Sequence, residues 1–385
     1  MLSRIIHNAK NYAGPHDQPF PATCPPMTCK LCLTAIMATA IAAAVGASPD
    51  VCAAPSEGLP PPVLRIELDQ RDLGRLVAAA TPALQKAPDP LAVMHTEGTL
   101  ATSDSYKRAQ ASSRDWGVMS ALASVFASTG ERRYLERYEH YLSAWLATYR
   151  ISANPIDETG LGHWLLAYRT AGGALSQPVQ SRMRMFACDL SSRYQQRQPA
   201  QRKTSTNNWQ SHRVKLAVMG ALACADPGLI EGATALFKDQ VRDNLLPTGE
   251  SIDFAERDAI HYVVYSLEPL LEAALFSGLY DRPLFPHVGP NGQSIIRTLE
   301  WLAPYARGEL KHEEFVRSTV RFDAQRAAAG IRGFSGPFDP QKTRATYWLA
   351  TRLDRRWSEL SLSLGEPSAS QRAPWLAKQI SAAVH

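Results

Sequence analysis

The repeated helical period of the apolar residues most constrains the fold of this chain. From residue 71 onward, segments such as "RRYLERYEHYLSAWLATYR" and "LIEGATALFKDQVRDNLL" place apolar residues at intervals of three and four, which lines one face of an α-helix. Strict apolar–polar alternation is scarce, and short turn sequences such as "ADPG" separate the segments. The sequence therefore predicts an all-α domain of about ten to twelve helices, packed as hairpins in an array, a bundle or a toroid.

The N-terminal part of the sequence differs from this pattern. Residues 27–55 contain one lysine, then an apolar run over about residues 31–45, then small residues, which is typical of a secretory signal. The 26 preceding residues leave open whether Met1 or Met27 is the true start. A membrane anchor is the alternative, although the run is shorter than the roughly 20 residues that a spanning helix needs. We expect an N-terminal extension with signal peptide over residues 1–54 and a single domain over residues 55–385.

Export also bears on the six cysteines. Four of them (Cys24, Cys29, Cys32 and Cys52) lie in or near the expected signal, so only Cys188 and Cys224 are certain to remain. Whether these two cysteines form a disulfide or are two buried free thiols stays open at this point. We expect a periplasmic or secreted protein, without membrane insertion after signal cleavage.

The net charge of the chain and the absence of several well-known motifs limit the classes of function that the sequence supports. The 41 Lys and Arg residues against 36 Asp and Glu give a net charge of +5, which suits a polyanionic ligand, and no basic helix or recognition motif points to nucleic acid. The sequence has no HExxH, GxSxG, P-loop or post-strand GxGxxG motif. We therefore predict no metal site and no cofactor.

The stretch "NNWQSHR" is the first candidate site. Asn208 and His212 are four residues apart, so they share a helix face if a helix begins near Asn208, and Trp209 and Arg213 have the same spacing. Asn207 could bind substrate, but Thr206 or Asn207 could equally be the N-cap. Capping does not explain a histidine on the same turn.

The stretch "DFAERDAIHYVVYSLEPLLEAAL" is the second candidate. On a helix, Arg257, His261 and Tyr265 lie on or near one stripe, and Tyr262 lies on an adjoining one. The polar first half suggests that these turns face a cleft, although a solvated helix start with tyrosines at the core edge has the same spacing. A long loop before residue 116 adds His95 as a further candidate for substrate binding.

Asn, His, Arg and Tyr side chains without a metal suit one reaction. Removing the C5 proton of a uronic acid requires the adjacent carboxylate charge to be offset, which Asn, His and Arg donors can do. A tyrosine or histidine can then take the C5 proton, and an acid can return one to the leaving glycosidic oxygen.

These residues resemble a known family. "NNWQSHR", "SIDFAERDAIHYVVYSLEPLL", "HTEGTL" and "NPIDET" are similar to stretches of the alginate lyase domain family of polysaccharide lyases, over about residues 90–350. The resemblance implies an α/α toroid, or incomplete α/α barrel, and an acidic polysaccharide substrate. It implies that Asn208 neutralises the substrate carboxylate and that Tyr262 matches the family's tyrosine.

Two departures from the family pattern affect the roles. Trp209 stands where the family has a histidine, so His212, one turn later, is the expected substitute as base or carboxylate partner. Arg257 precedes Tyr262 by five residues, and Asp258 occupies the position of the family's arginine. These changes leave open whether the polymer is alginate or a glucuronan-type chain.

The sequence therefore predicts a polysaccharide lyase that acts by β-elimination, with Tyr262, His212, Asn208 and Arg257 as catalytic residues. Two alternatives remain. One is an α/α-barrel glycoside hydrolase that uses Glu97 with Asp115 or Glu158 as its carboxylate pair. The other is a non-catalytic polysaccharide-binding protein on the same scaffold.

Overall fold

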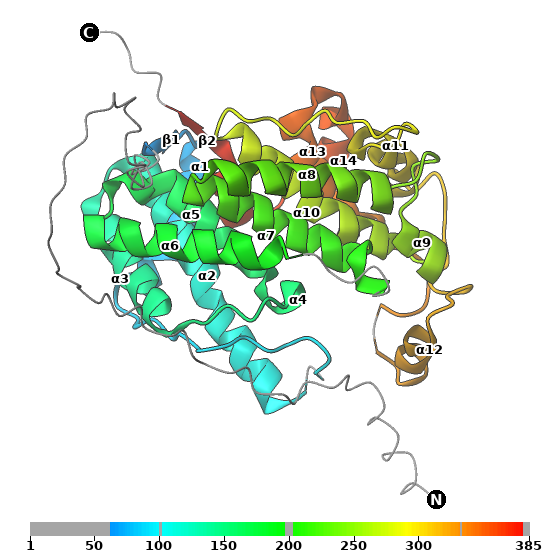
Figure 1. Cartoon of the computed structure of the whole chain (residues 1–385), viewed down its shortest axis with the longest axis horizontal. Coiled ribbons are helices and arrows are strands. Elements are labelled where there is room, and N and C mark those ends of the chain that lie inside the picture. The colour runs from blue at the N-terminus through cyan, green and yellow to red at the C-terminus, as the bar shows by residue number, and fades with distance from the viewer. Residues whose placement is uncertain (1–61, 100–101, 197–202, 332, 380–385) are drawn as a thin grey trace, which may run out of the picture. The chain divides into compact units, whose positions relative to one another are not determined.

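The computed structural model describes residues 62–99, 102–196, 203–331 and 333–379, and the expected signal peptide lies outside these residues. Ten of the described helices have ten or more residues: α1 (Gln70–Ala80), α2 (Asp104–Thr129), α3 (Arg132–Thr148), α5 (Gly162–Ala171), α6 (Gln177–Tyr194), α7 (Asn208–Cys224), α8 (Pro227–Asn244), α10 (Ile260–Gly278), α11 (Ile295–Ala306) and α13 (Arg344–Leu353). Shorter ones are α4 (Pro155–Glu158), α9 (Ile252–Arg257), α12 (Arg321–Ala328), α14 (Ser358–Leu364) and α15 (Ala369–Arg372). The described domain is predominantly helical, as the period predicts (Figure 1).

The long helices form two layers of an arc. In the inner layer α2 packs on α5, α5 on α7, α7 on α10 and α10 on α13. In the outer layer α6 and α8 flank α7, while α11 and α14 pack on α10 and α13 (Figure 1). Outer helices have one apolar face, so α6 and α8 carry buried residues on one side and exposed residues on the other, whereas α5, α7 and α10 of the inner layer are covered on nearly all sides.

Helix α7 is the most enclosed of these helices. Each of its residues is buried except Trp209, which is half-buried. The run from Val214 to Leu222 is apolar apart from Lys215, so its burial stabilises the fold by roughly 1.5–3 kcal/mol for each large side chain. This anchored half holds the polar first turns of α7 in one position.

A small antiparallel sheet joins the two ends of the described chain. Strand β1 (Leu64–Ile66) pairs with β2 (Ala377–Gln379), with Leu64 opposite Gln379. The sequence analysis did not predict these strands, because three residues are too few to show alternation. Arg372 and Asp72 form an ion pair of 2.5 Å beside the sheet, so the C-terminal segment is fixed against α1. No helix among the described residues has the length and apolar character needed to cross a membrane.

A disulfide resolves the open question about the cysteines. Cys188 of α6 is bonded to Cys224, the last residue of α7, and the bond closes a loop of 36 residues. It ties the outer helix α6 to the inner helix α7.

We expect replacement of both cysteines by serine to lower the free energy of unfolding by about 3 kcal/mol, because the bond restricts the unfolded chain. Urea denaturation of the oxidised wild type and the double variant measures this difference. Wild type unfolded in the presence of a reductant is the control and should match the variant, and equal midpoints for all three samples would contradict the prediction.

Candidate active site

The start of α7 is fixed by two neighbouring asparagines with different tasks. Asn207 is the N-cap, and its side chain accepts a hydrogen bond of 3.0 Å from the backbone N–H of Trp209. Asn208 is buried, and its Nδ2 donates to Oδ1 of Asp253 at 2.5 Å. The amide group has two N–H donors, so Asp253 uses one of them and sets the orientation of the other.

His212 lies one turn further along α7 and has an unusual environment. Its Nδ1 is 2.7 Å from Oγ1 of Thr159, and its ring lies 4.4 Å from the ring of Tyr265, centroid to centroid. The side chain is only 4% exposed, and Nε2 has no hydrogen-bond partner among the described residues. Burial, reinforced by the charge of Lys215, holds the pKa of His212 well below its usual range, so the imidazole is neutral at pH 7.

A cavity of about 240 Å³ lies between the inner helices, and His212 and Tyr265 line it. Its walls are formed by the first turns of α5, by the part of α7 from His212 to Lys215 and by the part of α10 from Tyr265 to Glu272, and Trp375 of the C-terminal segment contributes to them. The titratable groups that line it are His163, His212, Lys215, Tyr265, Glu268 and Glu272. His163 also lines the cavity, and desolvation by the surrounding helices lowers its pKa.

The two tyrosines of α10 occupy different places. Tyr265 lines the cavity beside His212, and burial, with smaller effects of Tyr262 and Asp157, raises its pKa to about 12. Tyr262 is not among the residues that line the cavity. The guanidinium of Arg257 lies 4.1 Å from the centre of its ring, and burial raises the pKa of Tyr262 although Arg257 and a hydrogen bond from Arg326 oppose the shift.

The charge of Arg257 is balanced outside the cavity. Its Nη1 lies 3.3 Å from Oδ1 of Asp323, which belongs to α12 and is almost completely buried. Arg257, Tyr262 and Asp323 therefore form one cluster that joins α9, α10 and α12, next to the first turn of α10 rather than beside His212.

His261 also pairs with a carboxylate. Its Nδ1 is 2.5 Å from Glu314, and the same buried carboxylate accepts hydrogen bonds from the backbone N–H groups of Ile260 and His261. Glu314 thus caps α10 from a distant part of the chain, which satisfies N–H groups that a helix start leaves unpaired.

The remaining predicted substrate-binding residues lie around the start of α7 and in the loop before α2. Arg213 is buried and donates to the carbonyl of Thr204 and to Gln210, and its guanidinium lies 5.9 Å from the ring centre of Trp209. His95 is largely exposed, with Nδ1 3.5 Å from Asp157. Neither Arg213 nor His95 lines the cavity, and the same holds for Asn207, Asn208 and Trp209 at the start of α7.

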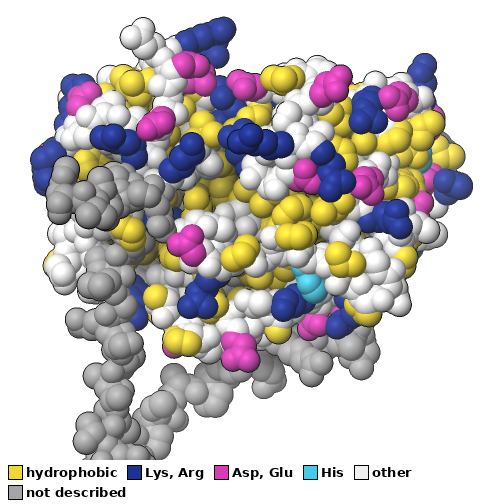
Figure 2. Space-filling view, turned by 90° about the horizontal axis from the view of Figure 1, so that it is seen from above, with side chains coloured by type: hydrophobic (Ala, Val, Ile, Leu, Met, Phe, Trp, Pro, Cys, Tyr) yellow, Lys and Arg dark blue, Asp and Glu magenta, His cyan; other side chains and the backbone are white. Residues whose placement is uncertain are grey.

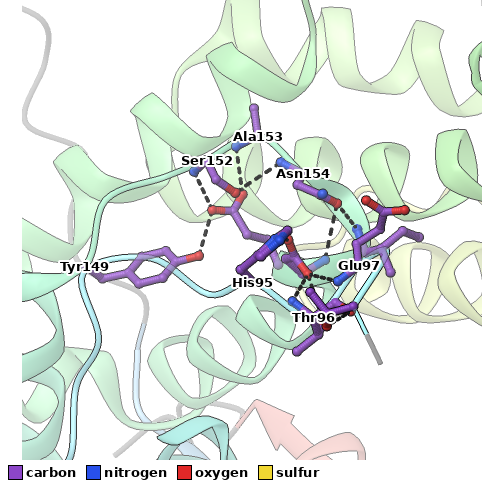
Figure 3. A network of polar contacts seen from close by, with 11 residues as sticks. His95, Thr96, Glu97, Tyr149, Ser152, Ala153 and Asn154 are labelled. Atoms are coloured by element: carbon purple, nitrogen blue, oxygen red, sulfur yellow. Dashed lines mark hydrogen bonds and ion pairs between the residues drawn. The ribbon is translucent and has the colours of Figure 1, made fainter. Parts of the chain in front are cut away.

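A polar network holds the segment that carries Thr159 (Figure 3). Asp157 accepts hydrogen bonds from the backbone N–H groups of Thr96 and Glu97, both at 2.7 Å. Glu158 accepts from the hydroxyls of Tyr149 and Tyr194 and from backbone N–H groups of residues 152 and 153. Two loops are therefore pinned to α4, directly before Thr159.

These contacts also test the carboxylate pair, Glu97 with Asp115 or Glu158, that a glycoside hydrolase would use. Glu158 is fully buried with four donors on its two oxygens. Asp115 is buried, and one of its oxygens accepts from Asp89 N–H and from the indole of Trp145. Glu97 remains partly exposed in the loop pinned by Asp157. Asp115 and Glu158 therefore serve the packing of the chain and do not line the cavity.

Sequence reasoning missed the inner half of the cavity. Lys215 of α7 and Glu272 of α10 form an ion pair of 2.9 Å across it, and Thr346 of α13 donates to Glu268 at 2.8 Å. The sequence did contain a pattern that could have indicated these residues. Glu268 and Glu272 follow Tyr265 by three and seven residues, so the three side chains lie on one face of an otherwise apolar helix. Thr159 carried no comparable signal.

Glu268 makes the stability of the fold depend on pH. Burial is the main cause that raises its pKa from 4.5 to about 7, with Thr346 and Lys215 opposing the shift. Between these values the folded state keeps a proton that the unfolded state has lost, so stability falls as the pH rises from 4.5 to 7.

We expect Glu268→Gln to raise the free energy of unfolding by up to about 3 kcal/mol above pH 7, and to change little near pH 4. Denaturant unfolding at both pH values tests this. Glu359→Gln, on the exposed side of α14, is the control and should behave as wild type at each pH. A gain of the same size at pH 4 would show that ionisation is not the cause.

Two further observations describe what surrounds the site. Among the residues that the structure describes, no group of three or more His, Cys, Asp or Glu side chains is placed to hold a metal ion. On the face shown in Figure 2, Lys and Arg side chains are interspersed with Asp and Glu, in keeping with the nearly balanced composition.

Comparison with solved structures identifies the fold. The chain is similar to an alginate lyase from Bacteroides ovatus (TM-score 0.59, 13% identity, covering 79% of this chain and 92% of that one). It is also similar to alginate lyase A1-III from Sphingomonas species A1 (TM-score 0.55, 16% identity, 82% and 92% covered). A histidine-to-alanine variant of alginate lyase A1-III complexed with tetrasaccharide gives a TM-score of 0.57 at 16% identity (82% and 91% covered). The fold is therefore the α/α toroid that the sequence resemblance predicted.

Sequence comparison identifies the family. No functionally curated protein matches the chain significantly. A family model described as alginate lyase matches residues 70–312, which is 243 of the 385 residues and includes Asn208, His212 and Tyr265. Because this match covers more than half of its length, the chain belongs to the alginate lyase family of polysaccharide lyases.

Proposed function

We propose that this protein cleaves a uronate-containing polysaccharide, of the alginate or glucuronan type, by β-elimination. The observation that carries the proposal is the pairing of a neutral, buried His212, whose Nε2 has no partner among the residues that the structure describes, with Tyr265 on the wall of one cavity. Buried polar atoms nearly always have a hydrogen-bond partner, so this nitrogen is placed to bind a polar group that enters the cavity.

The reaction needs one group that moves a proton and others that offset charge. Tyr265, as tyrosinate, would take the C5 proton, and the electrons of that bond would form the C4–C5 double bond while the C4–oxygen bond breaks. The tyrosine hydroxyl would then return the proton to the leaving oxygen, which regenerates tyrosinate and consumes no water. His212, on the cavity wall, would donate a hydrogen bond to the uronate carboxylate and stabilise the charge that builds up there. Asn208 is one turn earlier on α7 and is not part of the cavity lining, so it would donate only to a carboxylate that extends to that turn.

The cluster of Arg257 and Tyr262 has a different place in this proposal. Because Asp323 balances Arg257, and Arg257 lies against the Tyr262 ring outside the cavity, the cluster suits binding of a flanking sugar better than proton transfer. The geometry thus favours Tyr265 over Tyr262, although the resemblance in sequence favours Tyr262.

The purified protein should generate ultraviolet absorbance from an unsaturated uronate when it is given polymannuronate, polyguluronate or glucuronan. Neutral polysaccharides of similar length serve as the control and should remain intact. Absence of this signal on a broad uronate panel would contradict the lyase proposal.

One observation supports a second candidate, a glycoside hydrolase. The cavity holds two carboxyl groups in different environments: Glu268 has a pKa of about 7, and Glu272 is paired with Lys215. A hydrolase would give products with no double bond and would lose activity in Glu268→Gln, so product absorbance separates the two functions.

We also propose export to the periplasm or beyond. The disulfide between Cys188 and Cys224 supports an oxidising compartment, and the expected signal lies in residues 1–54. Expression of the full chain followed by fractionation should recover the oxidised protein outside the cytoplasm, whereas a reduced cytoplasmic product would contradict export.

A further inference from the structure

We propose that the hydroxyl of Thr159 fixes His212 in the tautomer that carries its proton on Nε2, so that His212 donates a hydrogen bond to the substrate and does not take the C5 proton. The substrate part of this inference rests on the proposed function. The tautomer itself follows from contacts within the protein.

Thr159 lies directly after α4, 53 residues before His212, and begins the short 3₁₀ helix Thr159–Leu161. Its Oγ1 is 2.7 Å from Nδ1 of His212, so one of the two groups donates to the other. Among the described residues, Nδ1 is the only hydrogen-bond partner of this hydroxyl, and Nε2 of His212 has none.

Counting protons selects one of the two arrangements. A neutral imidazole has one N–H group, and a threonine hydroxyl has one O–H group. If Thr159 donates to Nδ1, the imidazole proton is on Nε2, and only that N–H remains unpaired. If Nδ1–H donates instead, both the Thr159 hydroxyl proton and the bare Nε2 remain unpaired. The second arrangement leaves one more polar group without a partner among the described residues, so the contacts favour the first arrangement.

The segment that carries Thr159 is held firmly enough to impose this choice. Asp157 binds the backbone of residues 96 and 97, and Glu158 binds Tyr149, Tyr194 and the backbone of residues 152 and 153 (Figure 3). Gly160 is also in close contact with Trp116, so there is little room for the segment to move. Thr159 is therefore a positioning residue that acts through His212.

The consequence concerns the division of roles. A carboxylate oxygen of the substrate can accept from Nε2–H, whereas a carbon-bound proton cannot be transferred to a nitrogen that already carries one. Tyr265, on the same wall, is then left as the group that moves the C5 proton.

Nuclear magnetic resonance of the full chain labelled with [15N]histidine tests the tautomer directly. Long-range 1H–15N correlations distinguish Nε2–H from Nδ1–H, and the His212 signals are identified by their loss in His212→Gln. We expect Nε2–H in wild type and in Thr159→Ser, and a mixed or reversed tautomer in Thr159→Val. A wild-type imidazole with its proton on Nδ1 would overturn the inference. The nearly isosteric Thr159→Val identifies the same signals if His212→Gln does not fold.

Activity gives the second measurement. Thr159→Val should lower kcat about 10- to 100-fold with a smaller change in KM, and Thr159→Ser should retain wild-type kcat. Unchanged kcat together with an unchanged tautomer in Thr159→Val would also overturn the inference. If no uronan is cleaved by wild type, the proposed function fails, and the spectra alone decide the tautomer.

Discussion

Tyr265→Phe should lower kcat on the best uronate polymer by about 10³-fold, while Tyr262→Phe should retain at least a tenth of the wild-type rate. General acid–base catalysis contributes about 10²- to 10⁴-fold, and phenylalanine removes the hydroxyl without removing the ring. Tyr265 lines the cavity beside His212, whereas Tyr262 does not line it and has the Arg257 guanidinium 4.1 Å from the centre of its ring.

The two variants are matched controls for each other, because each removes one hydroxyl from the same helix, three residues apart. Their thermal unfolding should be compared before the rates are interpreted. A large loss in Tyr262→Phe with a small one in Tyr265→Phe would reverse our assignment in favour of the residue that the sequence resemblance indicates.

The second large effect is a steep rise of activity with pH. Burial raises the pKa of Tyr265 to about 12, so tyrosinate is a minor form at neutral pH. The tyrosinate fraction rises tenfold for each pH unit below that pKa, and kcat/KM reports ionisation of the free enzyme. We therefore expect kcat/KM to rise by about 100-fold between pH 7 and pH 9.

Other groups in the cavity require controls. Glu268 titrates near pH 7, so the profile should be repeated in Glu268→Gln, which should keep the same slope. His212 adds no inflection in this range, because its lowered pKa leaves it neutral throughout. A flat or falling profile between pH 7 and pH 9 would show that Tyr265 acts in its protonated form, as an acid only.

The start of α7 is a part of the site that could be predicted from the local sequence. The four-residue spacing of Asn208 and His212 places both on one helix, and the N-cap is one of the two residues that the sequence analysis considered. These are short-range features, determined by hydrogen bonds within a few residues and by the helical period. The family resemblance added the α/α toroid, which the structural comparison confirmed.

Which tyrosine of α10 lines the cavity could not be predicted from the local sequence. Both lie near the predicted polar stripe, and three residues along a helix turn a side chain by only about 60° from its neighbour's direction. The packing of α10 against α7 decides which hydroxyl enters the cavity. That packing depends on many side chains along both helices, so spacing alone could not rank Tyr265 above Tyr262.

The sequence by itself determined the helical class and the position at which α7 begins, and its resemblance to known sequences indicated the family. Tertiary structure alone decided that Cys188 bonds to Cys224, that Lys215 meets Glu272, and that Thr159 meets His212. The physical reason is distance along the chain: helices and caps form between neighbouring residues, whereas these pairs are 36 to 57 residues apart and meet only when the inner and outer helices pack.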